Sequence, residues 1–422
     1  MKYYRTVLVP IRQTLPDRRL SDIPAAVLGE LSSSGIADPV PAHARIAIGV
    51  GSRGISQIDV IVRAVVDFWR SHGMRPFIFP AMGSHGGGTP EGQASVLAHY
   101  GVDERSMGCP VISSFEVISL GRSELGVECF VSRDAWASDG VFLVGRIKWH
   151  TSFAGALESG IAKMTAIGLG KLEGARSSHA HARRHGMEAV IRSVAGHTLS
   201  TGRVLGGLGI LEDAWHHTAE VAVLKSATLM AEEERLLART KSWMARIPAA
   251  AVDVLIIDEI GKNIAGTGMD LKVVNRGAQG QYNPWPEPPT VERIFLRDLS
   301  DLSYGNAVGV GLADVAHDRL IRKIDVHAGR VNAVTSGSLA TVRTPLHFPS
   351  DRECLDLAMG TVGKPEKSEI TAVWIHNTLE LGAMAVTENL ADELRGNPGV
   401  VIDGRRFDFD FDSHGNLPAF AG

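Results

Sequence analysis

The stretch ARIAIGVGSRGISQIDVIVRAVVDFWRSHGMRPFIFP (residues 44–80) predicts a strand, a turn, a helix and a second strand in succession. The apolar run over 44–51 is β-like, and apolar residues then recur at helical spacing across 55–73. This helical stripe consists of Ile58, Ile61, Val62, Val65 and Val66. Gly73 suits the position after a helix, and the apolar run 75–83 follows it. A strand–helix–strand unit of this kind implies a parallel sheet with a right-handed crossover.

The pattern of apolar strands followed by polar turns returns in the second half of the chain, where DVLIIDEIG (253–261) follows IPAA (247–250). We therefore expect an α/β fold with two α/β domains. Their sheets should be mostly parallel and Rossmann-like, with the active site in the cleft between the domains. The expected boundaries are 1–247 for the N-terminal catalytic domain and 248–405 for the C-terminal domain. Residues 406–422 form a tail that we expect to pack back on the N-terminal domain.

The composition favours a small-molecule enzyme over a nucleic-acid or membrane protein. The chain has 422 residues, 44% of them hydrophobic and 21% charged, and its net charge of -4 provides no basic field for a polyanion. No apolar run reaches the roughly 20 residues of a membrane helix, and MKYYRTVLVPIRQ at the start does not resemble a signal peptide. The cysteines are scattered, as expected in a reducing compartment. We expect a cytoplasmic protein, and its oligomeric state stays open.

Isolated cationic and imidazole side chains follow three of the β-like runs. Arg53, His85 and His150 each come just after such a run, and ligands of open α/β sheets bind outside the carboxyl ends of the strands. In GVGSRG (49–54), the glycines, Ser52 and Arg53 could grip a phosphate or carboxylate. The alternative is a plain tight turn with a surface arginine. His85 lies among glycines that leave an imidazole reachable, or it is a loop histidine bonded to a carbonyl.

Three further segments carry candidate groups. RIKWHTSFAGALESGIAKM (146–164) places Lys163 among small residues, where a lysine can act as a nucleophile or covalent anchor; the alternative is an exposed helical pair with Glu158. GKLEGARSSHAHARRHG (170–186) contains three histidines, of which one could bind a metal, or the segment is a solvated basic loop. Within 258–277, the residues Asp270, Lys272 and Arg276 could face the crevice, where one or two cations would suit a substrate carboxylate.

The ordered set of motifs resembles the LarA-type, nickel-pincer-nucleotide-dependent lactate racemases. The match runs over most of residues 40–180 through GSRG, GSHGGGTPE, AWASDGVFLVGRIKWH and FAGALESGIAK, followed by a further histidine. The resemblance implies a racemase or epimerase of a 2-hydroxy acid. It also implies a pyridinium-3-thioamide-5-thiocarboxylic acid mononucleotide carrying nickel, made by separate cofactor-biosynthesis proteins. Hydride would move to and from the pyridinium ring while two histidines act as acid and base.

The resemblance also implies roles for individual residues. Ser52 and Arg53 would bind the cofactor phosphate, and His85 and His150 would be the catalytic acid/base pair. Lys163 would be the covalent anchor. The nickel ligand from the protein would be His179.

The chain departs from the family pattern in three places. The segment ALESGIAK is longer than the usual S-G-G-x-K, which makes Lys171 an alternative anchor, and Val50 replaces an acidic residue. The second domain lacks a clean match, so Lys272 and Arg276 are assigned to the substrate only by their surroundings. These departures leave lactate and a larger acid, such as a sugar acid, both open.

Two other functions fit the same residues. One is a metal-dependent hydrolase with His85, His150 and His179 as direct zinc ligands, since zinc takes three or four such ligands. The other is a non-catalytic protein that binds a nucleotide or a hydroxy acid.

Overall fold

The computed structural model describes residues 6–51, 54–83, 86 and 89–420. The chain divides into two compact units. One is the continuous segment Pro16–Met244, and the other combines Met1–Leu15 with Ala245–Gly422. Within the described residues, no helix is both long enough and apolar enough to cross a bilayer.

The unit Pro16–Met244 is built on a five-stranded sheet in the order β3-β2-β6-β7-β8. Its strands are β2 (Arg45–Val50), β3 (Arg75–Pro80), β6 (Gly140–Arg146), β7 (Val204–Glu212) and β8 (Thr218–Lys225). The first four strands of that order run parallel, and β8 is antiparallel to β7. A separate hairpin pairs β4 (Val117–Arg122) with β5 (Glu128–Ser132). The predicted parallel α/β sheet is therefore confirmed.

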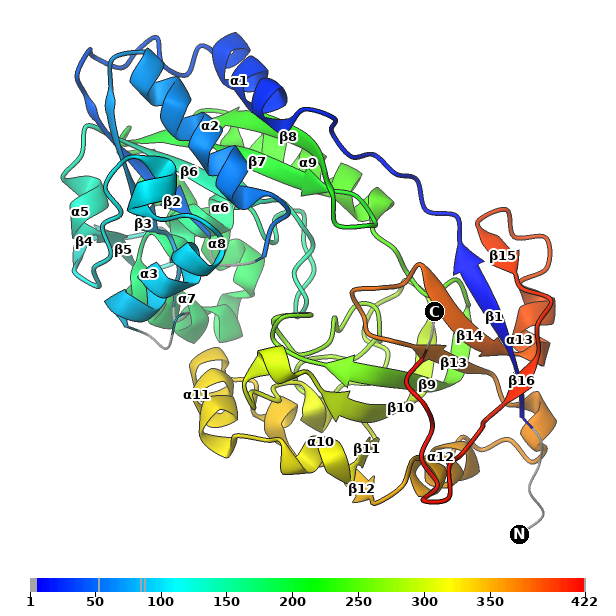
Figure 1. Ribbon diagram of the computed structural model, residues 1–422. Helices are drawn as coiled ribbons and strands as arrows, with labels where there is room; N and C mark the ends of the chain where they lie inside the picture. Colours follow the sequence, from blue (N-terminus) through cyan, green and yellow to red (C-terminus); the bar gives the residue numbers. More distant parts are fainter. Residues whose placement is uncertain (1–5, 52–53, 84–85, 87–88, 421–422) are drawn as a thin grey trace. The chain divides into compact units, whose positions relative to one another are not determined.

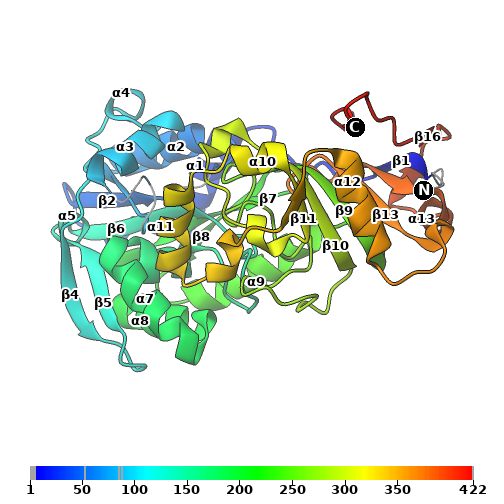
Figure 2. The same cartoon turned by 90° about the horizontal axis from the view of Figure 1, so that it is seen from below.

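Helices cover both faces of this sheet (Figures 1 and 2). On one face, α1 (Ile23–Ser34), α2 (Ile58–Ser71) and α3 (Pro90–His99) share a core with Ile48 and Val144. The opposite face is covered chiefly by α6 (Ile161–Lys163), the π-helical turn η2 (Met164–Gly168), α7 (Lys171–His185), α8 (Met187–Leu199) and α9 (Leu229–Trp243). Short helices α4 (Glu104–Met107) and α5 (Arg133–Trp136) complete the unit.

The local signals in the sequence account for these helices. All five residues of the predicted stripe of α2 are buried. Gly73 after that helix has a φ of 77°, in the left-handed region that glycine tolerates best. Thr89 caps α3, because its hydroxyl accepts a hydrogen bond from the Gly92 backbone N–H at 3.0 Å, and Pro90 is the first helical residue.

The second unit contains a nine-stranded sheet with the main order β12-β11-β10-β9-β13-β14-β1-β15, and β16 also pairs with β1. The strands are β1 (Val7–Gln13), β9 (Ala251–Ile260), β10 (Thr290–Leu299), β11 (Val315–His317), β12 (Leu346–Phe348), β13 (Ala372–Ile375), β14 (Ala383–Thr387), β15 (Val400–Ile402) and β16 (Phe407–Asp408). The run from β12 to β13 is parallel. The strands β14, β15 and β16 each pair antiparallel to a neighbour. The helices are α10 (Asp318–Arg322), α11 (Val326–Ser336), α12 (Asp351–Gly360) and α13 (Glu388–Glu393).

Two expected domain boundaries are corrected by the structure. The first strand does not belong with residues 16–244, because β1 is paired on both sides by β14 and β15 of the second sheet. The described part of the expected tail, 406–420, also belongs to the second unit and not to the N-terminal domain. Its strand β16 pairs with β1, and the tail belongs to the unit that contains Ala245–Gly422.

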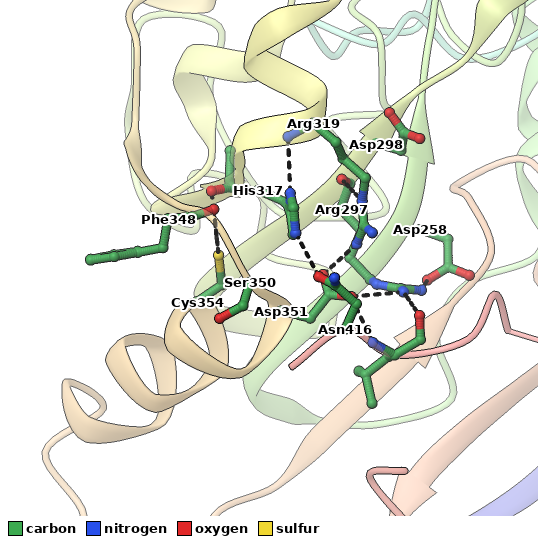
Figure 3. A network of polar contacts seen from close by, with 12 residues as sticks. Asp258, Arg297, Asp298, His317, Arg319, Phe348, Ser350, Asp351, Cys354 and Asn416 are labelled. Atoms are coloured by element: carbon green, nitrogen blue, oxygen red, sulfur yellow. Dashed lines mark hydrogen bonds and ion pairs between the residues drawn. The ribbon is translucent and has the colours of Figure 1, made fainter. Parts of the chain in front are cut away.

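A buried polar network fastens that tail to the second sheet (Figure 3). Arg297 lies in register between Asp258 of β9 and His317 of β11, and it forms ion pairs with Asp258 at 2.5 Å and with Asp351 of α12 at 2.9 Å. The guanidinium also donates to the Leu417 carbonyl, while the Leu417 N–H donates to Asp351. These contacts to the backbone explain why the tail stays on this unit.

Candidate functional site

The topological switch point of the five-stranded sheet lies between β2 and β6. The chain leaves β2 for β3 on one side and later returns to β6 on the other, so the strand order reverses there. Ligands of open α/β sheets bind outside the carboxyl ends of the strands at such a point. The segments that begin at Gly51 and at Ile147 follow these two ends, and they contain Ser52, Arg53 and His150.

The helical segment 161–185 packs closely against these strand ends. A Cβ atom on Gly51 would lie 3.8 Å from Met164 Sδ, and a Cβ on Gly145 of β6 would overlap that sulfur. At the end of β3, a Cβ on Gly83 would lie 3.0 Å from the Cβ of Ala175 in α7. Small residues at the strand ends therefore bring Lys163 and α7 close to the rim of the sheet.

His150 begins a loop whose base is closed by backbone hydrogen bonds. Lys148 and Ser159 exchange both of their N–H···O bonds, at 3.0 and 3.1 Å. Inside the loop, the carboxylate of Glu158 is fully buried and accepts hydrogen bonds from the N–H groups of His150 and Gly155. Lys241 of α9 forms an ion pair with the same carboxylate at 2.6 Å. Glu158 is thus an internal brace, which corrects its interpretation as part of an exposed helical pair.

Around His150, a second set of contacts orients the imidazole. The Ser152 backbone N–H donates to Nδ1 at 3.2 Å, and the Ser152 hydroxyl lies 3.1 Å from the same nitrogen. Because that hydroxyl can donate or accept, Nδ1 has a partner whether or not it carries a proton. Phe153 stacks on the imidazole with ring centroids 4.4 Å apart. Lys163 Nζ lies 5.9 Å from the centroid of the same Phe153 ring.

Lys163 and His179 belong to the same helical region and influence each other electrostatically. Burial, together with the positive charge of Lys163, lowers the pKa of His179 to about 4. The imidazole is therefore neutral at pH 7 and keeps a lone pair available for a metal. His179 lies within α7, so the interpretation of 170–186 as a solvated basic loop is wrong. His181 points elsewhere, because its Nδ1 lies 2.9 Å from the Ser177 carbonyl oxygen.

Lys171, the alternative anchor, is a core residue. Only 1% of its surface is exposed, and burial lowers its pKa to about 8. Its Nζ donates to the carbonyl oxygen of Pro80 and to Oε1 of Gln93 at 3.4 Å. Gln93 in turn donates to the carbonyl oxygens of Met82 and Gly83. Lys171 therefore fastens the end of β3, which makes it a poorer anchor than the half-buried Lys163.

Three predicted site residues, Ser52, Arg53 and His85, lie outside the described residues. The segment after Arg53 is held by a mostly buried ion pair between Arg146 of β6 and Glu212 of β7, with N···O of 2.6 Å. Arg146 also donates to the Gly54 carbonyl at 3.0 Å, and Glu212 accepts from the Ser56 N–H at 3.3 Å. This pair fixes the backbone beyond the GSRG turn.

In the second unit, the two cations assigned to the substrate differ in their surroundings. Arg276 is 1% exposed and donates to the carbonyl oxygens of Val291 at 2.6 Å and Glu292 at 2.9 Å. An ion pair with Asp314 at 3.3 Å occupies the guanidinium further. These contacts make Arg276 a structural residue and argue against its prediction as a substrate ligand. Lys272 is also buried, with Nζ 5.5 Å from the centroid of the Trp285 ring.

Metal-ligand geometry among the described residues does not point to a zinc hydrolase. The one described group of three closely spaced ligand atoms is Asp17, Asp213 and His217. It contains neither His150 nor His179. The hydrolase interpretation gains no support there, although its third predicted ligand, His85, lies outside the described part of the chain.

Several residues in or near the candidate site had only weak signals in the sequence. Phe153 follows His150 closely, but nothing in the pattern indicates that its ring contacts both His150 and Lys163. Arg146 directly follows the apolar run of β6, so its strand-end position was a usable signal. Glu233 falls on the apolar stripe of α9, where an acidic residue at a core position could have been noticed.

Comparison with known proteins provides a likeness in fold. The structure resembles that of the lactate racemase apoprotein from Thermoanaerobacterium thermosaccharolyticum, with a TM-score of 0.53 and 13% sequence identity. The likeness covers 86% of this chain and 99% of the other. No protein-family model matches this chain, and no curated protein sequence matches it. At this identity, the likeness establishes the shared two-unit α/β fold.

Proposed function

We propose that this protein is an isomerase that racemises or epimerises a 2-hydroxy acid with a nickel-pincer nucleotide. The observation that carries the proposal is the grouping of His150, Phe153, Lys163 and His179 beside the carboxyl ends of β2 and β6. The likeness in fold to a lactate racemase supports it, as do the motifs that contain these residues.

The described residues fit such a cofactor. Lys163 offers a half-buried primary amine beside an aromatic ring, which suits a covalent anchor. His179 offers a mostly buried imidazole, a ligand type that nickel accepts together with sulfur donors. We assign Lys163 to the covalent link and His179 to the nickel, with Ser52 and Arg53 proposed for the phosphate. When bound, this cofactor supplies a reversible hydride acceptor.

The protein's own part of the reaction is proton transfer and orientation. We propose that His150 moves the proton of the substrate hydroxyl at Nε2, because Nδ1 is engaged by Ser152. The Ser152 hydroxyl can follow either protonation state of the ring, as required of a group that is a base for one enantiomer and an acid for the other. His85 is the proposed partner on the opposite face of the substrate.

We propose a 2-hydroxy acid as the substrate, as the family resemblance implies. A small acid such as lactate, or a longer sugar acid, brings a carboxylate that needs a cation. Lys272 remains the proposed partner from the second unit, whereas Arg276 is occupied by the protein's own backbone. The cofactor would come from separate biosynthetic proteins.

The test is production of the protein in a host that makes the cofactor, followed by intact-mass spectrometry, nickel analysis and assays with single enantiomers of lactate and of sugar acids. We expect a covalent adduct, stoichiometric nickel and interconversion of one acid. His150→Ala should retain adduct and nickel but lose about 10²–10⁴-fold in turnover. Lys163→Ala should lose the adduct, and the exposed Lys225→Ala is the matched control. Protein that carries neither nickel nor adduct would refute the proposal.

A further inference from the structure

Helix α9 contains an acidic residue in its buried stripe. The buried residues of this helix are Leu229, Glu233, Leu236, Leu237 and Thr240. Glu233 is 1% exposed, and burial raises its pKa to about 7 even though backbone N–H groups at Ile161 and Ala162 lower it. Its Oε1 has no hydrogen-bond partner among the described residues. Burying a carboxyl group with an unsatisfied oxygen costs free energy of folding, so packing alone does not explain an acidic residue at this position.

The carboxyl group of Glu233 caps the helix that contains Lys163. Its Oε2 accepts a hydrogen bond from the Ala162 N–H at 3.0 Å. Gly160, the residue before α6, has no side chain to provide a cap of its own. A Cβ on Gly160 would overlap the Glu233 carboxyl group, so only glycine lets this acid approach the first turn. Glu233 therefore serves as an N-cap supplied by another helix.

The same helix holds the loop of His150. Lys241, two turns further along α9, pairs with Glu158 at 2.6 Å and donates to the Gly155 carbonyl oxygen at 2.8 Å. Glu158 accepts from the His150 N–H. Helix α9 thus contacts the segment from His150 to Lys163 at two places, through Lys241 at Gly155 and Glu158 and through Glu233 at Ala162.

We propose that α9 is the element that places the two reactive groups of this segment, and that Glu233 is the positioning residue for Lys163. This inference rests on the proposed function for its chemical meaning, since Lys163 there is the covalent anchor. Its structural content concerns the apoprotein alone. The cap holds the backbone N–H of Ala162, the residue directly before Lys163, and so fixes where the amine lies relative to the Phe153 ring and His179.

The experiment measures Lys163 directly in the apoprotein, without cofactor or turnover. Acetylation by an N-hydroxysuccinimide ester is followed at each lysine by peptide mass spectrometry, and amide hydrogen exchange is followed at residues 161–163. In Glu233→Met we expect both rates at this turn to rise at least threefold, because a helix cap is lost. Glu233→Gln keeps a carbonyl acceptor and should stay within twofold of the wild type. Acetylation of the exposed Lys225 should not change in either variant.

Two further variants keep the test decisive. Glu232→Met makes the same chemical change one residue earlier, where the carboxylate accepts a hydrogen bond from the Thr228 hydroxyl, and it should leave the rates at Lys163 unchanged. Gly160→Ala displaces the Glu233 carboxyl group without removing it, so it should reproduce the effect of Glu233→Met even if that variant folds poorly. The double variant should be no worse than either single one. Unchanged Lys163 rates in folded Glu233→Met or Gly160→Ala, or a Gln variant that behaves like Met, would overturn the proposal. Absence of nickel or adduct in protein made with the cofactor would refute the proposed function. The acetylation and exchange rates of the apoprotein would still test the role of Glu233.

Discussion

Asp351→Ala should strongly destabilise the second unit. Its side chain is fully buried and accepts hydrogen bonds from Arg319 at 2.5 Å, from Arg297 at 2.9 Å and from the Leu417 N–H at 2.9 Å (Figure 3). Burial alone would raise the pKa of Asp351, but the hydrogen bonds and charges of the two arginines outweigh it and lower that pKa. When the carboxylate is removed, Arg297 keeps its ion pair with Asp258 and its hydrogen bond to the Leu417 carbonyl. The Leu417 N–H loses its acceptor.

The expected loss follows from these three contacts. Removing one partner from a buried ion pair costs about 3–5 kcal/mol, and we expect the lower end of this range because Arg297 keeps its ion pair with Asp258. With a urea m-value of about 3 kcal/mol per molar, the unfolding midpoint should fall by about 1–2 M. Asp356→Ala, an exposed change on the same helix, should move the free energy of unfolding by less than about 0.5 kcal/mol.

Urea titration monitored by circular dichroism measures this loss, and hydrogen exchange at Leu417 reports release of the tail. The pH dependence gives a second check. A carboxyl whose folded pKa is lowered contributes stability above the pKa of unfolded aspartate, about 3.9, and loses it as the pH falls through the folded value. The difference between wild type and Asp351→Ala should therefore shrink below about pH 4. A decrease in the free energy of unfolding of less than about 1 kcal/mol at pH 7 would refute the inference that this network holds the tail on the second sheet.

Three other changes probe the unit Pro16–Met244. The folded pKa of Lys171 is about 8, which is below that of an unfolded lysine. The free energy of unfolding of the wild type, relative to that of Lys171→Met, should therefore rise between about pH 8 and 10, by up to about 1.4 kcal/mol per pH unit. Urea titrations at several pH values check this. Gly168→Ala would place a Cβ 2.7 Å from the Ala81 carbonyl oxygen and should cost about 1–3 kcal/mol, measured by thermal unfolding. Glu158→Ala removes the acceptor of the His150 N–H and should lower turnover of the loaded enzyme at least tenfold; equal turnover would contradict its role as a brace.

The sequence predicts those parts of the structure that depend on local pattern. The stripe of α2, the Thr89 cap and the apolar strands of both units all follow from residues close together in the chain. The strand-end position of His150 was likewise visible, because the end of an apolar run can be recognised without knowing its neighbours.

Contacts between distant residues could not be predicted in this way. Nothing in the first strand indicates that Leu8 pairs with Thr387, because pairing partners depend on the whole sheet. Arg276 has the sequence environment of a binding residue, yet its guanidinium donates to backbone carbonyls of β10, a strand that begins 14 residues later in the chain. The cap provided by Glu233 depends on how closely α9 packs on Gly160, which periodicity does not reveal.

The interruption of one sheet by a complete unit has a consequence for biosynthesis. The ribosome makes β1 before residues 16–244, whereas its hydrogen-bonded neighbours, β14 and β15, are made after them. Residues 16–244 carry all strands of their own sheet and can acquire their structure while translation continues. The native pairing of β1 therefore forms only after β14 and β15 have been translated, so the sheet of the second unit is completed later than that of residues 16–244.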